Sequence, residues 1–395
     1  MRVVIVGAGI LGMMAAWKLA RQGHRVVLVD AGRIPNPDGA SFDQQRLLHD
    51  FESSLGESVA LLRSSLAGWS ELWRDLRRCF LVPSQVLAVS TVEGDLAERA
   101  AAAFTRAQVD HEVLELPELE RRCPQFRFTD ARFGVIRNTG GLMLADQLLE
   151  ALALRLKDLG VDLVPEATVT SINSTRPSVT LESGATLAAD CIVVTAGAWI
   201  DGLVPRLRRH TWAHRQITIF PTTPRHLEAY WRKSPIVVDF GGDQGLWLAP
   251  PLCGTALKLA ASCHGRPGNP ASAADRAIGN HEGARVLSYF ARHFTDAAAY
   301  GISRIKACFY SMSVERMLVI EPLEAQSRPV WAVCGCNGQG FKFAPLIADL
   351  IVGLVEQRDQ GSAMIGNAGF SVAGIPEYDA RNRIDQPRLT AAGKQ

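Results

Sequence analysis

The sequence predicts an α/β protein, and three observations support this prediction. A short β-branched run at 3–6 leads into a glycine-rich turn and then into an apolar stretch with helical spacing from Ile10 to Gln22, which Gly23 ends. A second strand-like run, Arg25 to Asp30, completes a βαβ unit at the start of the chain. Strand-like and helix-like runs keep alternating farther on, which is typical of a sheet covered by helices. Because 395 residues exceed what one compact core holds, we expect two domains.

The rest of the chain follows the same logic of periodicity and turn residues. Helices are expected where apolar residues recur at helical spacing, at 46–79 (one or two helices), 95–108, 144–159 and 344–356. Strands are expected at 85–91, 162–164, 168–173, 178–182, 191–194 and 330–334, with short strands and Pro or Gly turns over 215–262. From Ser371 the chain is polar and contains two prolines, so we expect a loosely attached tail.

Composition excludes several classes of function. The net charge of +2 gives no basic stripe for nucleic acid and no acidic partner surface. No apolar run reaches the roughly 18–20 residues that a membrane-spanning helix needs, and the apolar start at 3–6 ends in glycines, as a strand does and a signal peptide does not. The eight cysteines show no CxxC pair and no metal-ligand spacing. We therefore expect a cytoplasmic protein without a metal site, a membrane segment or an obligate protein partner.

The glycine-rich turn has the pattern of a dinucleotide-binding site. Gly7 allows a tight turn, Gly9 lets a pyrophosphate approach the backbone, and Gly12 lets helix and strand pack closely. Asp30 ends the next strand, where its carboxylate can accept ribose hydroxyls and disfavours the 2′-phosphate of NADP. The motif alone does not separate FAD from NAD. The predicted contacts here are Gly7, Gly9, Ile10, Leu11, Gly12, Asp30 and Ala31.

Segments elsewhere carry a more specific resemblance. Thr195-Ala196-Gly197-Ala198-Trp199 follows a predicted strand, and Leu257-Lys258-Leu259, Lys306–Ser311 and Gly335–Phe343 come later in the chain. In this order they resemble the glycine/D-amino-acid oxidase family of FAD-dependent oxidoreductases, and within it the sarcosine oxidases that hold their flavin covalently. The resemblance spans about Met1 to Glu356, and the C-terminal tail does not share it.

The resemblance implies a domain organisation and a cofactor. It implies FAD in a Rossmann-type FAD-binding domain assembled from residues 1–82, 140–210 and 305–370. An inserted mixed, mainly antiparallel α+β substrate domain would comprise 83–139 and 211–304, with the tail at 371–395. Further flavin contacts are implied at Arg46, Val169, Ala196, Gly197, Trp199, Cys308, Gly338, Gln339, Gly340, Phe341 and Lys342.

Four positions carry the expected chemistry. Cys308 matches a cysteine that forms a thioether with the flavin 8α-methyl group, and Lys258 matches a lysine that activates oxygen. Lys342 matches a lysine that binds the substrate carboxylate, and Arg46 an arginine beside the flavin ring. Each residue type also has an ordinary alternative: Cys308 as a packed structural cysteine, and the three cations as solvent-facing side chains.

The substrate side departs from the sarcosine oxidases. His49 stands where they carry a second arginine for the substrate carboxylate, and histidine cannot offer a bidentate fork. Phe42 replaces a basic histidine, and 260–262 lacks an active-site histidine, although His264 follows. We therefore expect oxidation of the C–N bond of an amine, a secondary or cyclic amino acid, or an imine other than sarcosine. Oxygen would reoxidise the flavin and yield hydrogen peroxide.

Three other functions stay open at this point. An FAD-dependent amino-acid dehydrogenase would use an acceptor other than oxygen, and oxygen uptake with substrate separates it from an oxidase. An NAD-dependent dehydrogenase would lack the visible absorption of flavin. A non-catalytic FAD-binding subunit would keep its flavin oxidised with every amine.

Overall fold

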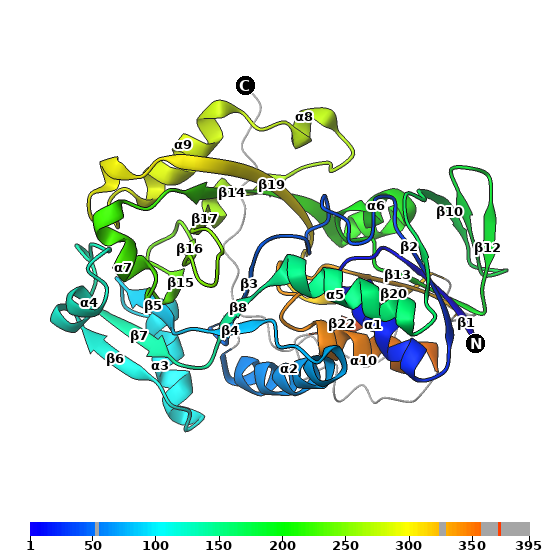
Figure 1. Cartoon of the computed structure of the whole chain (residues 1–395), viewed down its shortest axis with the longest axis horizontal. Coiled ribbons are helices and arrows are strands. Elements are labelled where there is room, and N and C mark those ends of the chain that lie inside the picture. The colour runs from blue at the N-terminus through cyan, green and yellow to red at the C-terminus, as the bar shows by residue number, and fades with distance from the viewer. Residues whose placement is uncertain (52–54, 324–328, 357–369, 373–395) are drawn as a thin grey trace.

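The computed structural model describes residues 1–51, 55–323, 329–356 and 370–372, and it contains two main sheets (Figure 1). One main sheet and most long helices lie on the right of Figure 1, and most strands of the other main sheet lie on the left, with β14 (Thr211–Pro221) and β19 (Ile302–Ser313) running between the two. None of the described helices is long and apolar enough to cross a bilayer.

The first main sheet has seven strands in the order β22-β20-β21-β13-β1-β2-β9. β1 lies near its centre, parallel to β2 and β13, which suits a β-branched run buried on both faces. β20 runs antiparallel to β21 and closes one side with β22. The strands are β1 (Arg2–Val6), β2 (Arg25–Val29), β9 (Asp162–Val164), β13 (Cys191–Val194), β20 (Leu318–Pro322), β21 (Val330–Cys334) and β22 (Phe370–Val372).

Helices cover one face of this sheet, and a small sheet covers the other. Val3 and Ile5 point into a core with Trp17 and Ile347 from the covering helices, whereas Val4 and Val6 point into a second core. The helices are α1 (Ile10–Arg21), α2 (Leu55–Leu76), α5 (Ala145–Asp158) and α10 (Ala344–Val355). The small sheet comprises β10 (Val169–Asn173), β11 (Ser178–Leu181) and β12 (Thr186–Ala188), and α6 (Ile200–Leu203) lies beside it.

The second main sheet has nine strands in the order β18-β14-β17-β16-β15-β5-β7-β6, with β19 paired to β14. Among the described residues of this sheet, β15 and β5 run parallel, and the other pairs are antiparallel. The strands are β5 (Val86–Ser90), β6 (Glu112–Glu115), β7 (Phe133–Arg137), β14 (Thr211–Pro221), β15 (Ile236–Asp239), β16 (Leu246–Ala249), β17 (Lys258–Ala261), β18 (Arg266–Pro267) and β19 (Ile302–Ser313). Its helices are α3 (Leu96–Arg106), α4 (Leu116–Arg122), α7 (Glu228–Trp231), α8 (Ala273–Arg276) and α9 (Asn280–Phe290).

A three-stranded ribbon joins the two main sheets. It comprises β3 (Arg46–Leu48), β8 (Gly141–Met143) and β4 (Leu81–Pro83), with β8 in the centre. The helix predicted from Arg46 is therefore wrong at its start, because the chain is extended there and the helix begins at Leu55. Two leucines in succession fit a strand as well as a helix, and pairing with the distant β8 decides between them.

Most other predicted elements are confirmed within a residue or two. Asp95 precedes α3 as its N-cap, and its side chain accepts a hydrogen bond from the N–H of Glu98. β14 starts earlier and is longer than expected, and α7 interrupts the strands predicted over 215–262. The first two residues of the predicted tail, Ser371 and Val372, are paired with β20 within β22, whereas 373–395 lies outside the described residues. The division into two domains stays a prediction, and β19 runs through its proposed boundary at 304–305.

Candidate active site

The glycine-rich turn lies at the carboxyl edge of the parallel strands. Gly7 has a φ of +107°, which L side chains rarely adopt, and its amide donates to the carbonyl of Val29 (2.8 Å). A Cβ on Gly12 would lie 2.0 Å from the Gly7 oxygen, so only glycine lets α1 begin this close to β1. Thr195 donates from Oγ1 to the same Gly7 oxygen (2.9 Å). The turn and the segment after β13, predicted separately, are thus in direct contact.

The start of α1 fits a phosphate group. Gly9 is the N-cap residue and has no side chain to occupy the helix N-terminus, and the first turn carries no acidic residue. Helix N-termini bind anions through their free N–H groups and their dipole. One of these groups is taken, because the Ile10 N–H donates to Ser41 Oγ (2.9 Å). The residues present therefore suit the pyrophosphate of a dinucleotide.

Asp30, predicted to bind ribose hydroxyls, also forms hydrogen bonds within the protein. Its Oδ2 accepts a hydrogen bond from the Ala8 N–H (2.8 Å), and its Oδ1 accepts from the Gly32 N–H (2.9 Å) and Asn36 Nδ2 (2.7 Å). A carboxylate has about four lone-pair sites, so about one remains on Oδ2. Asp30 thus braces the glycine-rich turn and keeps limited capacity for a ribose hydroxyl. Ala31, next to it, is exposed.

Cys308 lies on one polar face of the second main sheet. In β19 it is paired with Gln216 of β14, and Lys306 and Tyr310 flank it at i−2 and i+2 on the same face. The opposite face is mainly apolar, with Ile217 and neighbouring side chains in the core of this sheet, and Arg215 of β14 also lies on it. Cys308 is half-buried. The register, rather than the local sequence, shows which side chains accompany it.

The loop after β21 packs between this polar face and the glycine-rich turn. A Cβ on Gly338 would lie 3.7 Å from the ring of Tyr310, and one on Gly340 would lie 3.8 Å from Leu11 of α1. Gly338 has a φ of +77°, which favours glycine. Three of the predicted segments, from the N-terminus, β19 and the C-terminal loop, are therefore neighbours in space.

Lys342 closes this loop just before α10. Two side chains of α2 hold its carbonyl oxygen, since Ser65 Oγ donates to it and Trp69 Nε1 donates at 3.2 Å. The side chain of Lys342 is only 4% exposed, so it is not the solvated lysine of the alternative interpretation. Burial lowers its pKa to about 7, while the charge of Asp50 opposes that shift.

His49 and Asp50 lie beside Lys342 in the extended link after β3. Burial holds the pKa of His49 well below its usual value, and the Lys342 charge adds to this shift, so His49 is neutral at pH 7. Burial raises the pKa of Asp50, although Arg137 opposes the shift with a bidentate pair (3.1 and 2.7 Å). Arg137 was missed from the sequence, where nothing marks a strand arginine that pairs with a residue far along the chain.

Lys258 and Arg46 share one carboxylate. Lys258 Nζ and Arg46 Nη1 both donate to Oδ2 of Asp43, the latter at 2.8 Å. Burial would raise the pKa of Asp43, but the two cations together hold it well below its usual value. Burial lowers the pKa of Lys258 to about 8, and its Nζ lies 5.6 Å from the ring centroid of Trp247. Asp43 was not predicted, and Lys258 is 4% exposed rather than solvent-facing.

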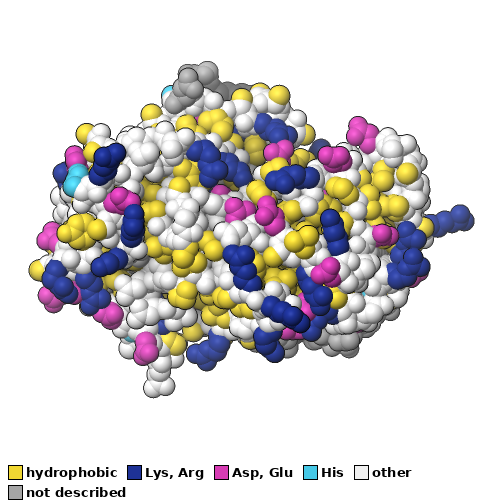
Figure 2. Space-filling model, viewed as in Figure 1, with side chains coloured by type: hydrophobic (Ala, Val, Ile, Leu, Met, Phe, Trp, Pro, Cys, Tyr) yellow, Lys and Arg dark blue, Asp and Glu magenta, His cyan; other side chains and the backbone are white. Residues whose placement is uncertain are grey.

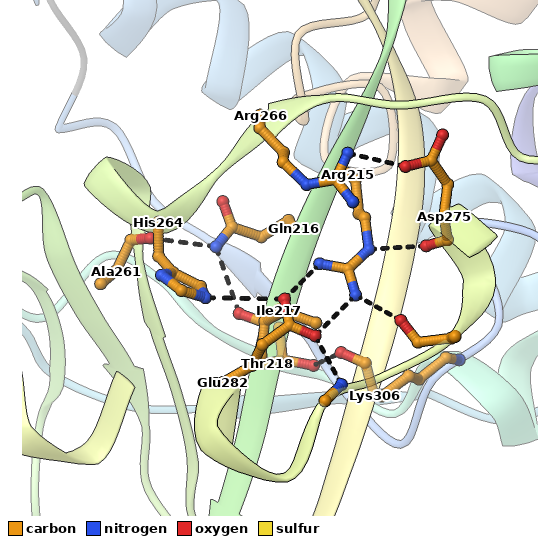
Figure 3. Close-up of polar contacts among 12 residues, drawn as sticks. Arg215, Gln216, Ile217, Thr218, Ala261, His264, Arg266, Asp275, Glu282 and Lys306 are labelled. Carbon is orange, nitrogen blue, oxygen red and sulfur yellow. Dashed lines mark hydrogen bonds and ion pairs between the residues drawn. The ribbon is translucent and has the colours of Figure 1, made fainter. Parts of the chain in front are cut away.

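Val169 lies apart from this cluster, at the start of β10, and is buried in the core beneath the small sheet. Gly197 and Trp199 form a short 3₁₀ turn after β13 that packs against β19, β14 and β21. Figure 3 shows His264 beside Arg215 and Glu282, whose Oε1 lies 3.8 Å from His264 Nε2. His264 thus meets α9 on the other side of the sheet from Lys258, and it does not replace the missing histidine.

The surface carries no single sign of charge on the face shown in Figure 2. Lys and Arg side chains there alternate with Asp and Glu among hydrophobic patches. Such a face gives no broad field to attract a strongly charged polymer.

Comparison with known proteins identifies the family. The family described as FAD dependent oxidoreductase (DAO) matches residues 2–354. The chain belongs to this family, so the predicted family, fold class and dependence on FAD are confirmed.

Relatives and solved structures agree with this assignment. The chain is 24% identical over 367 residues to peroxisomal sarcosine oxidase of Mus musculus, with 88% of this chain and 90% of the relative covered. It is 23% identical over 355 residues to N-methyl-L-tryptophan oxidase of Yersinia pestis (strain Pestoides F), with 88% and 93% covered. The fold also matches the structure of NikD, an unusual amino acid oxidase essential for nikkomycin biosynthesis, with a TM-score of 0.77 at 18% identity, covering 95% of this chain and 99% of that chain.

Proposed function

We propose that this protein oxidises the C–N bond of a secondary or cyclic amine, with oxygen as the electron acceptor and FAD linked to Cys308. One observation carries the proposal. Cys308 lies between Lys306 and Tyr310 on the polar face, and the loop at Gly338 packs against Tyr310. Cys308 also lies within electrostatic range of Lys258, and the loop that packs against Tyr310 reaches Leu11 at the start of α1, which supports a flavin site between them.

We infer the substrate class from the names of the relatives and from the replacement of an expected arginine by His49. The two curated relatives are named for sarcosine and N-methyl-L-tryptophan, which are both secondary amines. In this chain neutral His49 cannot bind a carboxylate as an arginine does, so Lys342 is left as the carboxylate-binding cation among the predicted residues. We therefore expect a substrate whose binding depends more on contacts with its apolar part than the binding of sarcosine does.

The residues around the cofactor have distinct tasks. Bound FAD would accept the equivalent of a hydride from the carbon next to the substrate nitrogen. Lys258, held in place by Asp43, would stabilise negative charge on oxygen as oxygen takes up electrons. The N-terminus of α10 and Lys342 would favour negative charge at the end of the C-terminal loop. Arg46, fixed on Asp43 and on the Ala40 carbonyl, would orient the flavin ring.

Cys308 would hold the flavin through a bond from its Sγ to the 8α carbon, and the bound flavin together with oxygen would supply the two-electron oxidation that this thioether requires. Lys306 lies two residues before Cys308 on the same face of β19.

Acid precipitation tests the attachment. We expect the yellow colour of the purified protein to stay in the pellet, and the Cys308→Ala variant to release it to the supernatant. Cys336→Ala is the matched control, because that cysteine lies in the neighbouring loop and should keep the colour in the pellet. Colour in the wild-type supernatant would rule out the thioether.

Oxygen uptake tests the reaction. Secondary and cyclic amines should bleach the flavin without oxygen and produce peroxide with oxygen. Lys258→Met should slow reoxidation by about 10²–10³-fold while leaving the bleaching step nearly unchanged. Bleaching without peroxide would instead show a dehydrogenase.

We also propose a cytoplasmic location. All eight cysteines are free, which suits a reducing compartment.

A further inference from the structure

The loop at 36–46 connects the two main sheets through polar contacts. Lys306 Nζ donates to the carbonyl of Phe42 (2.6 Å), and Lys258 Nζ donates to Asp43. Gln44 exchanges two hydrogen bonds with the backbone of Ala256, donating at 3.2 Å and accepting at 3.0 Å. The loop therefore meets β17 and β19 of the second sheet directly beside the proposed flavin face.

Asp43 is the charged centre of this loop. Its Oδ2 accepts from both Lys258 and Arg46, its Oδ1 accepts from the Gln44 N–H (2.8 Å), and its backbone carbonyl accepts from the Asp146 N–H (2.9 Å). The side chain is only 5% exposed. With its position fixed from several sides, this carboxylate sets where both cations lie.

We propose that Asp43 is the positioning residue of the oxygen-reacting centre, holding Lys258 in place and in its charged form. The proposal rests on the function proposed above, in which Lys258 faces oxygen. It adds a residue to that site and a means by which the site responds to pH.

The direction of the effect follows from the charges around Lys258. Burial favours neutral Lys258, and the positive charge of Arg46 adds to this effect. The Asp43 carboxylate and, more weakly, Cys308 on β19 favour the charged form. Lys306 and Asp146 also lie within range of Asp43. Without the Asp43 charge, Lys258 would be a buried amine beside an arginine, and it would lose its proton at lower pH.

Direct titration of Lys258 tests this inference. The chain has seven lysines, so their ¹³Cε signals give a simple spectrum, and Lys258→Met identifies the relevant signal. In the purified wild-type protein we expect a midpoint near pH 8. In Asp43→Asn the midpoint should fall by about 1–3 pH units. An unchanged or higher midpoint would overturn the proposal.

Two further variants make the result specific. Asp38→Asn removes an exposed carboxylate of the same loop, which pairs with Arg276 rather than with Lys258, and the Lys258 midpoint should not move. Arg46→Gln removes the other cation, and the midpoint should rise. If Asp43→Asn fails to fold, this upward shift of the Lys258 midpoint still tests the proposal. A fall of the midpoint in Arg46→Gln would count against it.

Reoxidation of the reduced enzyme supplies the functional arm. The pH at which reoxidation by oxygen slows should shift downward in Asp43→Asn together with the Lys258 midpoint. Because the titration needs neither substrate nor turnover, it can succeed even where the proposed oxidase reaction fails. A shifted titration with an unshifted reoxidation profile would overturn the oxygen role of Asp43 and leave only its electrostatic effect.

Discussion

Replacing Gly12 with alanine tests the packing that brings the glycine-rich turn to the edge of the sheet. The added Cβ would lie 2.0 Å from the Gly7 oxygen and 2.7 Å from Thr195 Oγ1, far inside van der Waals contact. The nearest atom belongs to the backbone, so α1 or the turn itself must move. Overpacking costs about 1–3 kcal/mol, and loss of the Thr195 hydrogen bond about 1 kcal/mol more. Alanine returns about 1 kcal/mol through its helix propensity.

The net expectation is a loss of about 1–3 kcal/mol in unfolding free energy, together with loss of bound FAD. Urea denaturation followed by tryptophan fluorescence measures the first quantity, and absorbance of the purified protein measures the second. Gly202→Ala in α6 is the matched control, because a Cβ there meets nothing within 4 Å. That variant should keep its flavin and be as stable as the wild type or slightly more stable. A Gly12→Ala protein with normal stability and full flavin content would refute the reasoning.

Two other predictions concern buried charges. Arg215 is 2% exposed and pairs bidentately with Glu282 (2.6 and 2.9 Å). Arg215→Met should therefore lower the unfolding free energy, measured by urea denaturation, by about 3–5 kcal/mol. Arg276→Met, which breaks an exposed ion pair, should cost less than about 1 kcal/mol. Similar losses in both variants would contradict this. Burial lowers the pKa of Lys342 to about 7 in the folded protein, from 10.5. Between these two pH values the unfolded chain holds a proton that the folded protein has released. The unfolding free energy should therefore rise with pH in this range, by up to about 1.4 kcal/mol per pH unit. Lys342→Met should remove this part of the slope, and equal slopes would show that Lys342 keeps its proton.

The sequence predicts best where the relevant chemistry is contiguous. The turn from Gly7 to Gly12 lies between its own strand and helix, so local spacing suffices to place it. The same holds for α10, where Pro345 and a glycine-rich loop mark the start. For Cys308, resemblance indicates the residue, but only the pairing of β19 with β14 shows its neighbours.

The sequence predicts poorly where distant partners decide. Arg46 and its neighbours fit a helix until β8 pairs with them, and Asp43 has no mark in the sequence that foretells Lys258, 215 residues away. The Asp50–Arg137 pair spans 87 residues in the same way. Such pairs depend on topology, and the charge of each residue gives no indication of its partner. Local sequence patterns therefore could not predict the ion pairs formed by Asp43 and Asp50.

The loop at 36–46 links the N-terminus of α1, where the pyrophosphate would bind, to Lys258, which is proposed to face oxygen. Ser41 accepts a hydrogen bond from the N-terminus of α1, where the pyrophosphate would bind, and Asp43, two residues later, holds Lys258. Because only Phe42 separates them, we expect a displacement at Ser41 to be passed in part to Asp43, against the contacts that hold Asp43 from other sides. A Ser41→Ala protein that binds FAD poorly should for this reason also show a displaced Lys258 titration, even though no side chain touching Lys258 has been changed.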